Sequence, residues 1–211
     1  MRFNLRVESH RETSDFFACG VNASCFIDVH LVMFITLIGY RGTGKSTLAP
    51  RLAARLNFDW VDADVELESL TGRTIREIFA TDGEPEFRRI EREVLLQLLK
   101  RDRLVLAAGG GAIMNEATRQ DFRNVGPVVW LQASVETIAR RILREGTTAA
   151  HRPNLTPKGG IDEIRALVTQ REPLYQSCAT ITVQSEGSSI ESLVQRIIPQ
   201  LPADYRKEIR T

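Results

Sequence analysis

Residues 39–46 read Gly-Tyr-Arg-Gly-Thr-Gly-Lys-Ser, which fits the pattern G-x-x-x-x-G-K-[ST]. An apolar run at 33–38 comes directly before this segment, and a helical pattern covers residues 45–56. A buried strand, a glycine-rich turn and a helix in this order form a loop that binds nucleotide phosphates. The glycines let the backbone approach the phosphate oxygens, and the helix N-terminus adds positive potential. The segment therefore predicts a nucleotide-binding α/β domain.

Three side chains of this segment carry the expected chemistry. We expect the Lys45 ammonium to reach the β- and γ-phosphates, the Ser46 hydroxyl to bind Mg²⁺ and Thr47 to contact the α-phosphate. The alternative is a glycine-rich turn with a surface lysine, which the flanking strand and helix disfavour.

No acidic residue ends the apolar run at 104–108, and the pattern Asn-Lys-x-Asp does not occur. Both observations argue against GTPases and motor-type ATPases.

Strands and helices alternate along the chain from residue 33 onward. Apolar runs predict strands at 33–38, 59–61, 104–108, 128–131 and 180–183. Helical patterns cover residues 45–56, 64–80 with a break at Thr71-Gly72, a segment that begins near Glu84-Pro85, 134–144, 161–176 and 188–199. Because the strands are almost continuously apolar, we expect an α/β fold of three layers, a parallel sheet with helices on both faces. The stretch 145–160 is too long for a simple connection, which is typical of a mobile lid or binding loop.

Length and composition indicate one compact domain. The chain has 211 residues, of which 43% are hydrophobic, and single domains of this size are common. Residues 1–32 are polar or mixed and show no clear period, whereas the strand pattern begins at Met33. We expect residues 1–32 to be a poorly ordered extension or the product of a misassigned start codon. Residues 33–201 are then the domain, and residues 202–211 are a C-terminal tail.

Charge and cysteine content argue against several classes of partner. The chain has 28 basic and 27 acidic residues and a net charge of +1, so we expect neither a nucleic acid nor a membrane as a partner. No run approaches the roughly 20 apolar residues that span a bilayer, and charged residues interrupt the start of the chain where a secretory signal would need an apolar core. The three cysteines, which lack metal-binding spacing, predict free thiols in a reducing cytoplasm: Cys19, Cys25 and Cys178.

Two acidic residues follow the second predicted strand, at Asp62 and Asp64. Side chains alternate along an extended segment, so we expect both carboxylates to point the same way. In open α/β sheets, ligands bind beyond the carboxyl ends of the strands. One carboxylate could hold the Mg²⁺ shell through water, and the other could orient an acceptor hydroxyl and take its proton. Asp64 could instead cap the following helix, or do both.

Several arginines and glycines are candidates for the acceptor site. Arg88 and Glu91 are three residues apart on a predicted helix, so they share a face and can pair. Three glycines at 109–111 end the third strand, which suggests close approach of the backbone to a ligand. Arg152 in the long loop could close over phosphates, and Arg171 could clamp a carboxylate. The simpler alternatives are a solvated ion pair, a flexible turn and ordinary surface arginines. Three more arginines are candidates for nucleotide contact, although we assign most of them to a solvated helix face: Arg140, Arg141 and Arg144.

Taken in order, these motifs resemble the shikimate kinase family. The resemblance runs from Met33 to about Leu201 and rests on six segments: residues 39–47, Asp62-Ala63-Asp64, Phe87-Arg88-Arg89-Ile90-Glu91, Gly109-Gly110-Gly111, Arg152-Pro153 and Arg171-Glu172-Pro173-Leu174-Tyr175. It implies the nucleoside-monophosphate-kinase fold with a five-stranded parallel sheet. The implied reaction is transfer of phosphate from ATP to the 3-hydroxyl of shikimate, a step toward chorismate and the aromatic amino acids. Members of the family are usually cytoplasmic monomers.

The resemblance also implies roles for particular residues. The ATP site would comprise Gly42, Thr43, Gly44, Lys45, Ser46, Thr47 and Arg152. Ser46 would bind Mg²⁺, and Asp62 would support it through water. Shikimate would be held by Asp64, Arg88, Gly109, Gly110, Gly111 and Arg171. The residues that act directly in the transfer would be Lys45, Asp64 and Arg152.

Two departures from the family pattern and two rival functions remain. The loop at 145–151 is longer than usual, and Asn154 stands where the family commonly has leucine. Neither departure removes a residue that the chemistry needs.

A related small-molecule kinase, such as a gluconate kinase, would share the phosphate loop but should not need the triple glycine together with both arginine motifs. A catalytically silent nucleotide-binding module would have no need of Lys45, Asp64 and Arg152 together.

Overall fold

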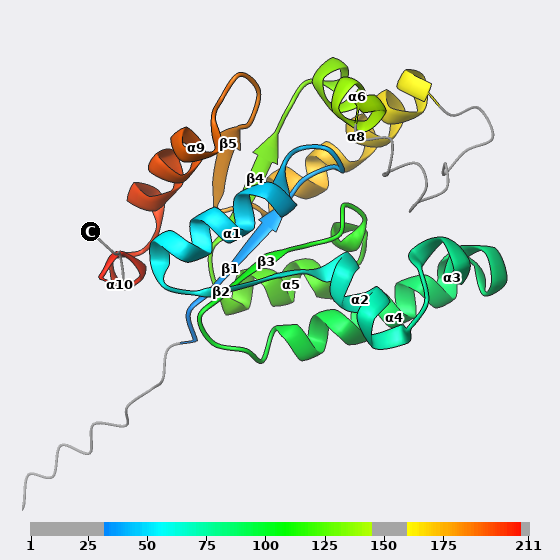
Figure 1. Ribbon diagram of the computed structural model, residues 1–211, viewed down its shortest axis with the longest axis horizontal. Helices are drawn as coiled ribbons and strands as arrows, with labels where there is room; N and C mark the ends of the chain where they lie inside the picture. Colours follow the sequence, from blue (N-terminus) through cyan, green and yellow to red (C-terminus); the bar gives the residue numbers. More distant parts are fainter. Residues whose placement is uncertain (1–31, 145–159, 208–211) are drawn as a thin grey trace, which may run out of the picture. The chain divides into compact units, whose positions relative to one another are not determined.

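A computed structural model describes residues 32–144 and 160–207 (Figure 1). Its five strands form one sheet in the order β2-β3-β1-β4-β5, and every neighbouring pair is parallel. The strands are β1 (Phe34–Ile38), β2 (Asp59–Asp62), β3 (Leu104–Ala107), β4 (Val128–Gln132) and β5 (Ile181–Gln184). The predicted five-stranded parallel sheet is therefore confirmed.

Helices follow each of the strands. They are α1 (Lys45–Leu56), α2 (Ala63–Thr71), α3 (Ile75–Thr81), α4 (Gly83–Leu98), α5 (Glu116–Val125), α6 (Val135–Arg144), α8 (Gly160–Cys178), α9 (Ile190–Ile197) and α10 (Ala203–Arg206). Two short 3₁₀ turns are η1 (Ala112–Met114) and η2 (Ile198–Gln200). The predicted break in the 64–80 helix is present, because Gly72 ends α2 in the left-handed conformation (φ 64°) and Thr74 caps α3 together with Glu77.

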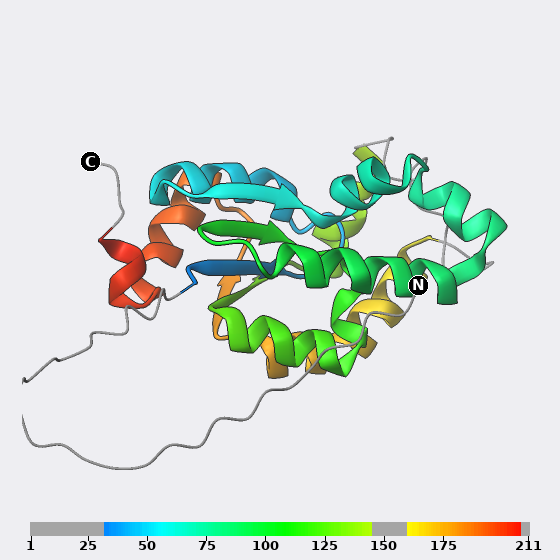
Figure 2. The same cartoon turned by 90° about the horizontal axis from the view of Figure 1, so that it is seen from below.

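The helices cover the sheet in two layers, each with its own core. Alternate residues of β1 face opposite sides: Ile35 and Leu37 pack with α1 and α9, whereas Phe34 and Ile38 pack with α4, α5 and α8. Figure 2 shows the two layers, with α1 in cyan and α9 in orange-red on one side of the sheet and α5 and α8 on the other. The central strands β3, β1 and β4 are buried along almost their whole length, which explains their continuous apolar sequences. Of the two edge strands, β2 is partly exposed and β5 alternates between buried and exposed residues. The three-layer architecture agrees with the prediction.

Helix α5 was missed by sequence reasoning. It lies between the triple glycine and β4, and only Thr118 and Phe122 among its ten residues are buried. So few apolar positions do not make a recognisable helical stripe. One signal was readable: Asn115 is a good N-cap, and its side chain accepts a hydrogen bond from the Thr118 amide.

The packed chain continues beyond Leu201. Helix α10 contributes Tyr205, which is 3% exposed and lies 6.1 Å from the ring of Phe58. The Tyr205 hydroxyl bonds to both backbone groups of Phe34, accepting from the amide and donating to the carbonyl at 3.2 Å each. The C-terminal helix thus holds the first residue of the central strand.

Two expectations lie outside the described residues. They concern the N-terminal extension and the lid that carries Arg152. Among the helices in 32–144 and 160–207, none has both the length and the apolar character that a membrane crossing requires.

Sheet topology decides where a ligand can bind. β1 lies between β3 and β4. The connection that leaves β1 runs to β2 on one side of it, whereas those that leave β3 and β4 run to β4 and β5 on the other side. Ligands of open α/β sheets bind outside the carboxyl ends of the strands at such a point. The register places Leu37 of β1 and Asp62 of β2 level with Ala107 of β3. The phosphate loop, the acidic pair and the triple glycine therefore follow their strands at the same edge of the sheet.

Candidate active site

The glycine-rich loop is packed against the end of β4. Gly39 has a φ of 142°, and a Cβ at this position would lie only 2.6 Å from the Leu131 carbonyl oxygen. A backbone carbonyl cannot move aside as a side chain can, so only glycine fits here. The loop that follows β1 is thereby set close to the sheet before it turns into α1.

Lys45, the first residue of α1, lies against the loop from which it extends. Its ammonium donates hydrogen bonds to the carbonyls of Gly39 at 2.8 Å and Tyr40 at 3.0 Å, and the residue is 8% exposed. The Thr43 hydroxyl donates to the same Tyr40 carbonyl at 2.8 Å. By contrast, Ser46 and Thr47 are exposed in the first turn of α1. Lys45, Ser46 and Thr47 are thus the first three residues of α1, and the Lys45 ammonium is hydrogen-bonded to the loop before it.

Ser46 and Asp62 join the phosphate loop to the end of β2. The Ser46 hydroxyl donates a hydrogen bond to Asp62 Oδ2, while Asp62 Oδ1 accepts from the Asp64 amide at 3.0 Å. Hydroxyl and carboxylate oxygens are ligands that suit Mg²⁺, which usually takes one or two protein ligands and completes its shell with water and phosphate. Within 32–144 and 160–207, no group of three or more acidic, histidine or cysteine side chains forms a self-sufficient metal site. The residues present fit a metal that is shared with a phosphate ligand.

The structure corrects the expectation that Asp62 and Asp64 alternate along an extended segment. Strand β2 ends at Asp62, and Asp64 already lies in the first turn of α2. Asp62 is the N-cap of α2, so the capping role considered for Asp64 belongs to its neighbour. The two carboxylates are instead placed by the strand-to-helix turn, in which the Asp62 side chain holds the Asp64 backbone.

Arg88 on α4 is fixed by two carboxylates. Its Nη1 donates to Glu91 Oε2 at 2.7 Å, and its Nε and Nη2 donate to Glu84 Oε1 at 3.2 and 3.1 Å. The Glu91 side chain is 6% exposed and that of Glu84 is 55% exposed. Burial works to lower the pKa of the Arg88 guanidinium, but the two carboxylates outweigh it and the pKa is raised. The expected pairing of Arg88 with Glu91 is present, and Glu84 is an additional partner.

The triple glycine lets two arginines approach the backbone. A Cβ on Gly111 would lie 2.5 Å from Arg88 Nη1 and 2.6 Å from Nη2. The Gly110 carbonyl accepts hydrogen bonds from Arg171 Nη1 at 3.2 Å and from the Tyr175 hydroxyl at 2.6 Å. Gly109 begins the turn into η1, since its carbonyl accepts from the Ala112 amide at 3.1 Å. Side chains of α4 and α8 therefore both contact the glycine segment, Arg88 at Gly111 and Arg171 at Gly110.

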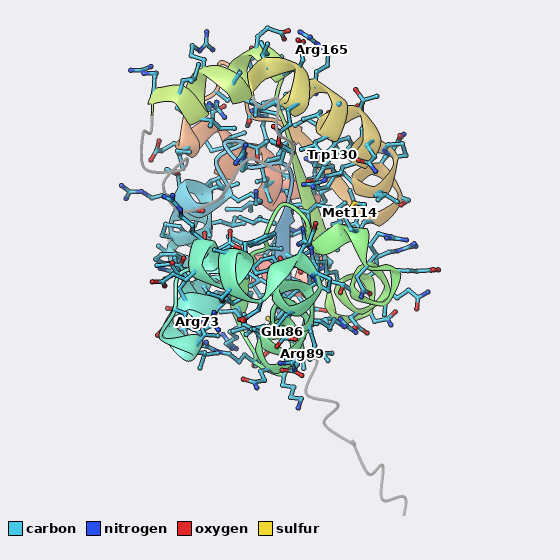
Figure 3. All side chains as sticks on the ribbon, turned by 90° about the vertical axis from the view of Figure 1, so that its right-hand side faces the viewer. Arg73, Glu86, Arg89, Met114, Trp130 and Arg165 are labelled. Carbon is cyan, nitrogen blue, oxygen red and sulfur yellow. The ribbon has the colours of Figure 1, made fainter. Side chains whose placement is uncertain are left out.

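Arg88 and Arg171 line one pocket of about 620 Å³. The pocket lies between α4, η1 and α8, and its wall includes Gly111 and Met114. Met114 is labelled below the gold α8 ribbon in Figure 3. The same view shows the ion pair of Glu86 and Arg89 on α4, which does not line the pocket. A Cβ on Gly110 would meet the Arg41 amide at 3.3 Å and the Gly39 carbonyl at 3.4 Å. The glycine segment therefore touches the phosphate loop and continues into the wall of the pocket with the two arginines.

Arg141 is a residue of the site that sequence reasoning did not separate from its neighbours. Its Nη1 donates to the carbonyls of Gly42 at 3.1 Å and Thr43 at 3.2 Å, and its Nη2 donates to the Ser185 carbonyl at 3.0 Å. Arg140 and Arg144 are exposed, in agreement with the assignment of most of these arginines to a solvated face. No sequence signal distinguishes Arg141, because its partners are far away along the chain.

Comparison with known proteins returns a consistent result. The family model described as "Shikimate kinase" matches residues 41–202. A shikimate kinase of Rhodopirellula baltica is 37% identical over 167 residues, which cover 79% of this chain and 89% of the relative. A shikimate kinase of Nitrobacter winogradskyi is 43% identical over 164 residues, which cover 78% of this chain and 74% of the relative.

Solved structures agree with these sequence matches. The shikimate kinase from Acinetobacter baumannii in complex with shikimate superposes with a TM-score of 0.73 at 37% identity and covers 79% of this chain and 90% of that chain. The shikimate kinase from Aquifex aeolicus superposes with a TM-score of 0.69 at 32% identity and covers 80% of this chain and 95% of that chain.

Proposed function

Because the chain belongs to the shikimate kinase family, we propose that it transfers the γ-phosphoryl group of ATP to the 3-hydroxyl of shikimate. The products are shikimate 3-phosphate and ADP, on the route to chorismate and the aromatic amino acids. The observation that carries the proposal is the pocket that Arg88 and Arg171 share beside the phosphate loop. Two guanidinium groups suit the single carboxylate of shikimate, because the planar fork of arginine matches a carboxylate in a two-pronged way.

The loop supplies the nucleotide side of the reaction. We assign the binding of the ATP phosphates to residues 42–47, whose amides and helix N-terminus favour negative charge. The Lys45 ammonium already lies at the loop through its contacts with Gly39 and Tyr40. It would exchange these carbonyls for β- and γ-phosphate oxygens, which are stronger partners because they are charged.

Ser46 and Asp62 would hold Mg²⁺ on this side of the site. Their oxygens suit the ion, and Asp62 would contact it through water. When bound, the ion neutralises charge on the phosphates. Asp62 has a second task within the protein, since it also caps α2.

The acceptor side positions shikimate for in-line attack. Arg88, Arg171 and the backbone at Gly109–Gly111 would hold its carboxylate and hydroxyls, and Asp64 would orient the 3-hydroxyl. The oxygen of that hydroxyl bonds to the γ-phosphorus while the bond to the bridging oxygen of ADP breaks, and the proton goes to Asp64. Such transfer depends mainly on positioning and charge stabilisation. Arg152, which lies outside the described residues, would neutralise charge on the transferred group.

A coupled assay of ADP release tests the proposed function. The purified protein with ATP and Mg²⁺ is offered shikimate or gluconate, and Lys45→Ala is the inactive control. We expect ADP release with shikimate, none above background with gluconate, and none from Lys45→Ala. Release with gluconate but not with shikimate would contradict the proposal, and no release with either would favour a silent nucleotide-binding module.

Two further expectations stay predictions. We propose that the protein acts as a monomer in the cytoplasm. Light scattering coupled to size-exclusion chromatography would check the first, and fractionation of the source cells would check the second. A stable dimer or a fraction bound to the envelope would contradict them.

A further inference from the structure

Tyr40 is a residue of the phosphate loop whose side chain is turned into the protein. It is 4% exposed and packs in a small cluster with residues of α6 and α8. The cluster consists of Tyr40, Ile138, Ala139, Ile142 and Ile164. The ring is therefore held by two helices while its backbone belongs to the loop that receives the nucleotide.

Two guanidinium groups lie near this ring. The Arg171 Cζ is 5.7 Å and the Arg41 Cζ is 5.9 Å from the ring centroid. Both distances are within the range in which the electron-rich face of an aromatic ring attracts a cation. The attraction is larger where water is excluded, and Arg171 is 7% exposed. The ring is thus a substantial partner of the Arg171 side chain.

Hydrogen bonds alone constrain Arg171 weakly. A guanidinium has five N–H donors, and in the described chain its Nη1 donates to Gly110 while its buried Nε has no hydrogen-bond partner. A single hydrogen bond leaves the plane of the group free to rotate, whereas a ring beside the group restricts it. The Tyr175 hydroxyl donates to the same Gly110 carbonyl, so Arg171 shares its one hydrogen-bond acceptor with a second donor.

The charge state of Tyr40 is compatible with this role. Burial raises the pKa of the phenol, and the nearby guanidinium groups of Arg41 and Arg171 oppose that rise in part. Glu163 of α8 also faces the phenol and acts to raise its pKa. The ring is therefore neutral at physiological pH, so it attracts the guanidinium through its face and not through a phenolate charge.

We propose that Tyr40 is a positioning residue for the acceptor: its ring, which is carried on the phosphate loop, orients Arg171 toward the shikimate carboxylate. The inference rests on the proposed function, because it needs Arg171 to bind the acid. It assigns to a residue of the nucleotide loop an effect on the other substrate. Shikimate affinity should then depend on an aromatic ring at position 40, and ATP affinity should not.

Steady-state kinetics of Tyr40→Leu and Tyr40→Phe test the inference. We expect Tyr40→Leu to raise KM for shikimate about tenfold, which corresponds to loss of a desolvated cation–π contact. Its KM for ATP and its kcat should stay within about twofold to threefold of the wild type. Tyr40→Phe keeps the ring and should restore KM for shikimate to within about twofold.

Two controls separate positioning from a loss of stability. Phe122→Leu removes a similar volume from a fully buried site on α5, and it should lower Tm with both KM values unchanged. In an Arg171→Lys background, Tyr40→Leu should add less than about threefold to KM for shikimate, because the planar cation has already gone. If Tyr40→Leu does not fold, Tyr40→Met replaces it, since the flexible methionine side chain fills irregular space.

The outcomes distinguish this inference from the proposed function. If the wild-type protein releases no ADP with shikimate, the proposed function is wrong and the inference falls with it. If the wild-type protein releases ADP with shikimate, the variants Tyr40→Leu and Tyr40→Met decide the inference alone. An unchanged KM for shikimate, or an equal rise in both KM values, would overturn it. The same holds if Tyr40→Phe is as impaired as Tyr40→Leu, because then the hydroxyl and not the ring would matter.

Discussion

The Arg88 guanidinium occupies the space that a side chain at Gly111 would need. A Cβ at residue 111 would lie 2.5 Å from Nη1, 2.6 Å from Nη2 and 2.8 Å from Cζ of Arg88. Real Cβ atoms do not approach other atoms so closely, so the two residues are complementary in shape. Helix α4 and the segment after β3, which are separate in sequence, thereby line the same pocket of about 620 Å³.

Gly111→Ala should therefore move Arg88 without unfolding the protein. The atoms in conflict are the far end of a flexible side chain, so Arg88 can swing away at small cost to the fold. We expect KM for shikimate to rise about tenfold or more, with KM for ATP nearly unchanged, as for loss of one charged contact to substrate. Gly72→Ala is a matched control, because its Cβ meets nothing within 4 Å while its φ of 64° is strained. It should lower Tm and leave both KM values alone.

The two carboxylates that hold Arg88 should contribute unequally. Glu91 is buried and Glu84 is half-exposed, and exposed ion pairs are weak because water screens them. Glu91→Gln should raise KM for shikimate about fivefold to tenfold and lower Tm, since it leaves a partly buried cation short of its partner. Glu84→Gln should change KM by about twofold at most. Equal effects of the two variants in the same kinetic and melting measurements would contradict this ranking.

Arg141 should matter to ATP and not to shikimate. Its guanidinium braces the carbonyls of Gly42 and Thr43 against Ser185. Arg141→Ala removes these bonds, so we expect KM for ATP to rise about tenfold with KM for shikimate within about twofold. Arg140→Ala, one position earlier on the same helix and exposed, is the control and should have little effect on either value. A rise in KM for shikimate alone would show that the brace does not act on the nucleotide loop.

Asp62 has two roles that different substitutions separate. Asp62→Asn keeps an N-cap for α2, because asparagine caps as well as aspartate. It should raise the Mg²⁺ concentration for half-maximal rate severalfold and leave Tm almost unchanged. Asp62→Ala removes the cap as well, at a cost of about 1 kcal/mol, which lowers Tm by about 2–4 °C in a chain of this size. A Mg²⁺ dependence that Asp62→Asn does not alter would exclude Asp62 from the metal shell.

Tyr205 should support the fold without affecting catalysis. Its hydroxyl bonds to both backbone groups of Phe34 at the end of the sheet away from the pocket. Tyr205→Phe leaves two buried backbone groups without this partner, so we expect a loss of roughly 1–3 kcal/mol in the free energy of unfolding. Chemical denaturation measures the loss, and kinetics at 25 °C should be unchanged. A large change in either KM would mean that α10 communicates with the active site.

Patterns that repeat over short distances were read correctly from the chain. The strand, the glycine turn and the helix around Lys45 follow one another directly in the sequence. The three central strands are apolar runs that are buried on both faces, so their pattern is also local. The Arg88–Glu91 pair was predictable because residues three apart share a helix face. The prediction for the acidic pair was wrong, because β2 ends at Asp62 and Asp64 already lies in α2, so the two residues do not share one extended segment.

The sequence by itself determined the class of fold and the phosphate loop, and it predicted the arginines that we propose to hold an acidic acceptor, because each depends on local spacing and composition. Only the tertiary structure decided which of these residues meet. Arg88 with Gly111, Arg171 with Tyr40, and Arg141 with the loop are contacts between elements far apart along the chain. Such contacts depend on how helices pack on the sheet, and no local periodicity encodes that packing.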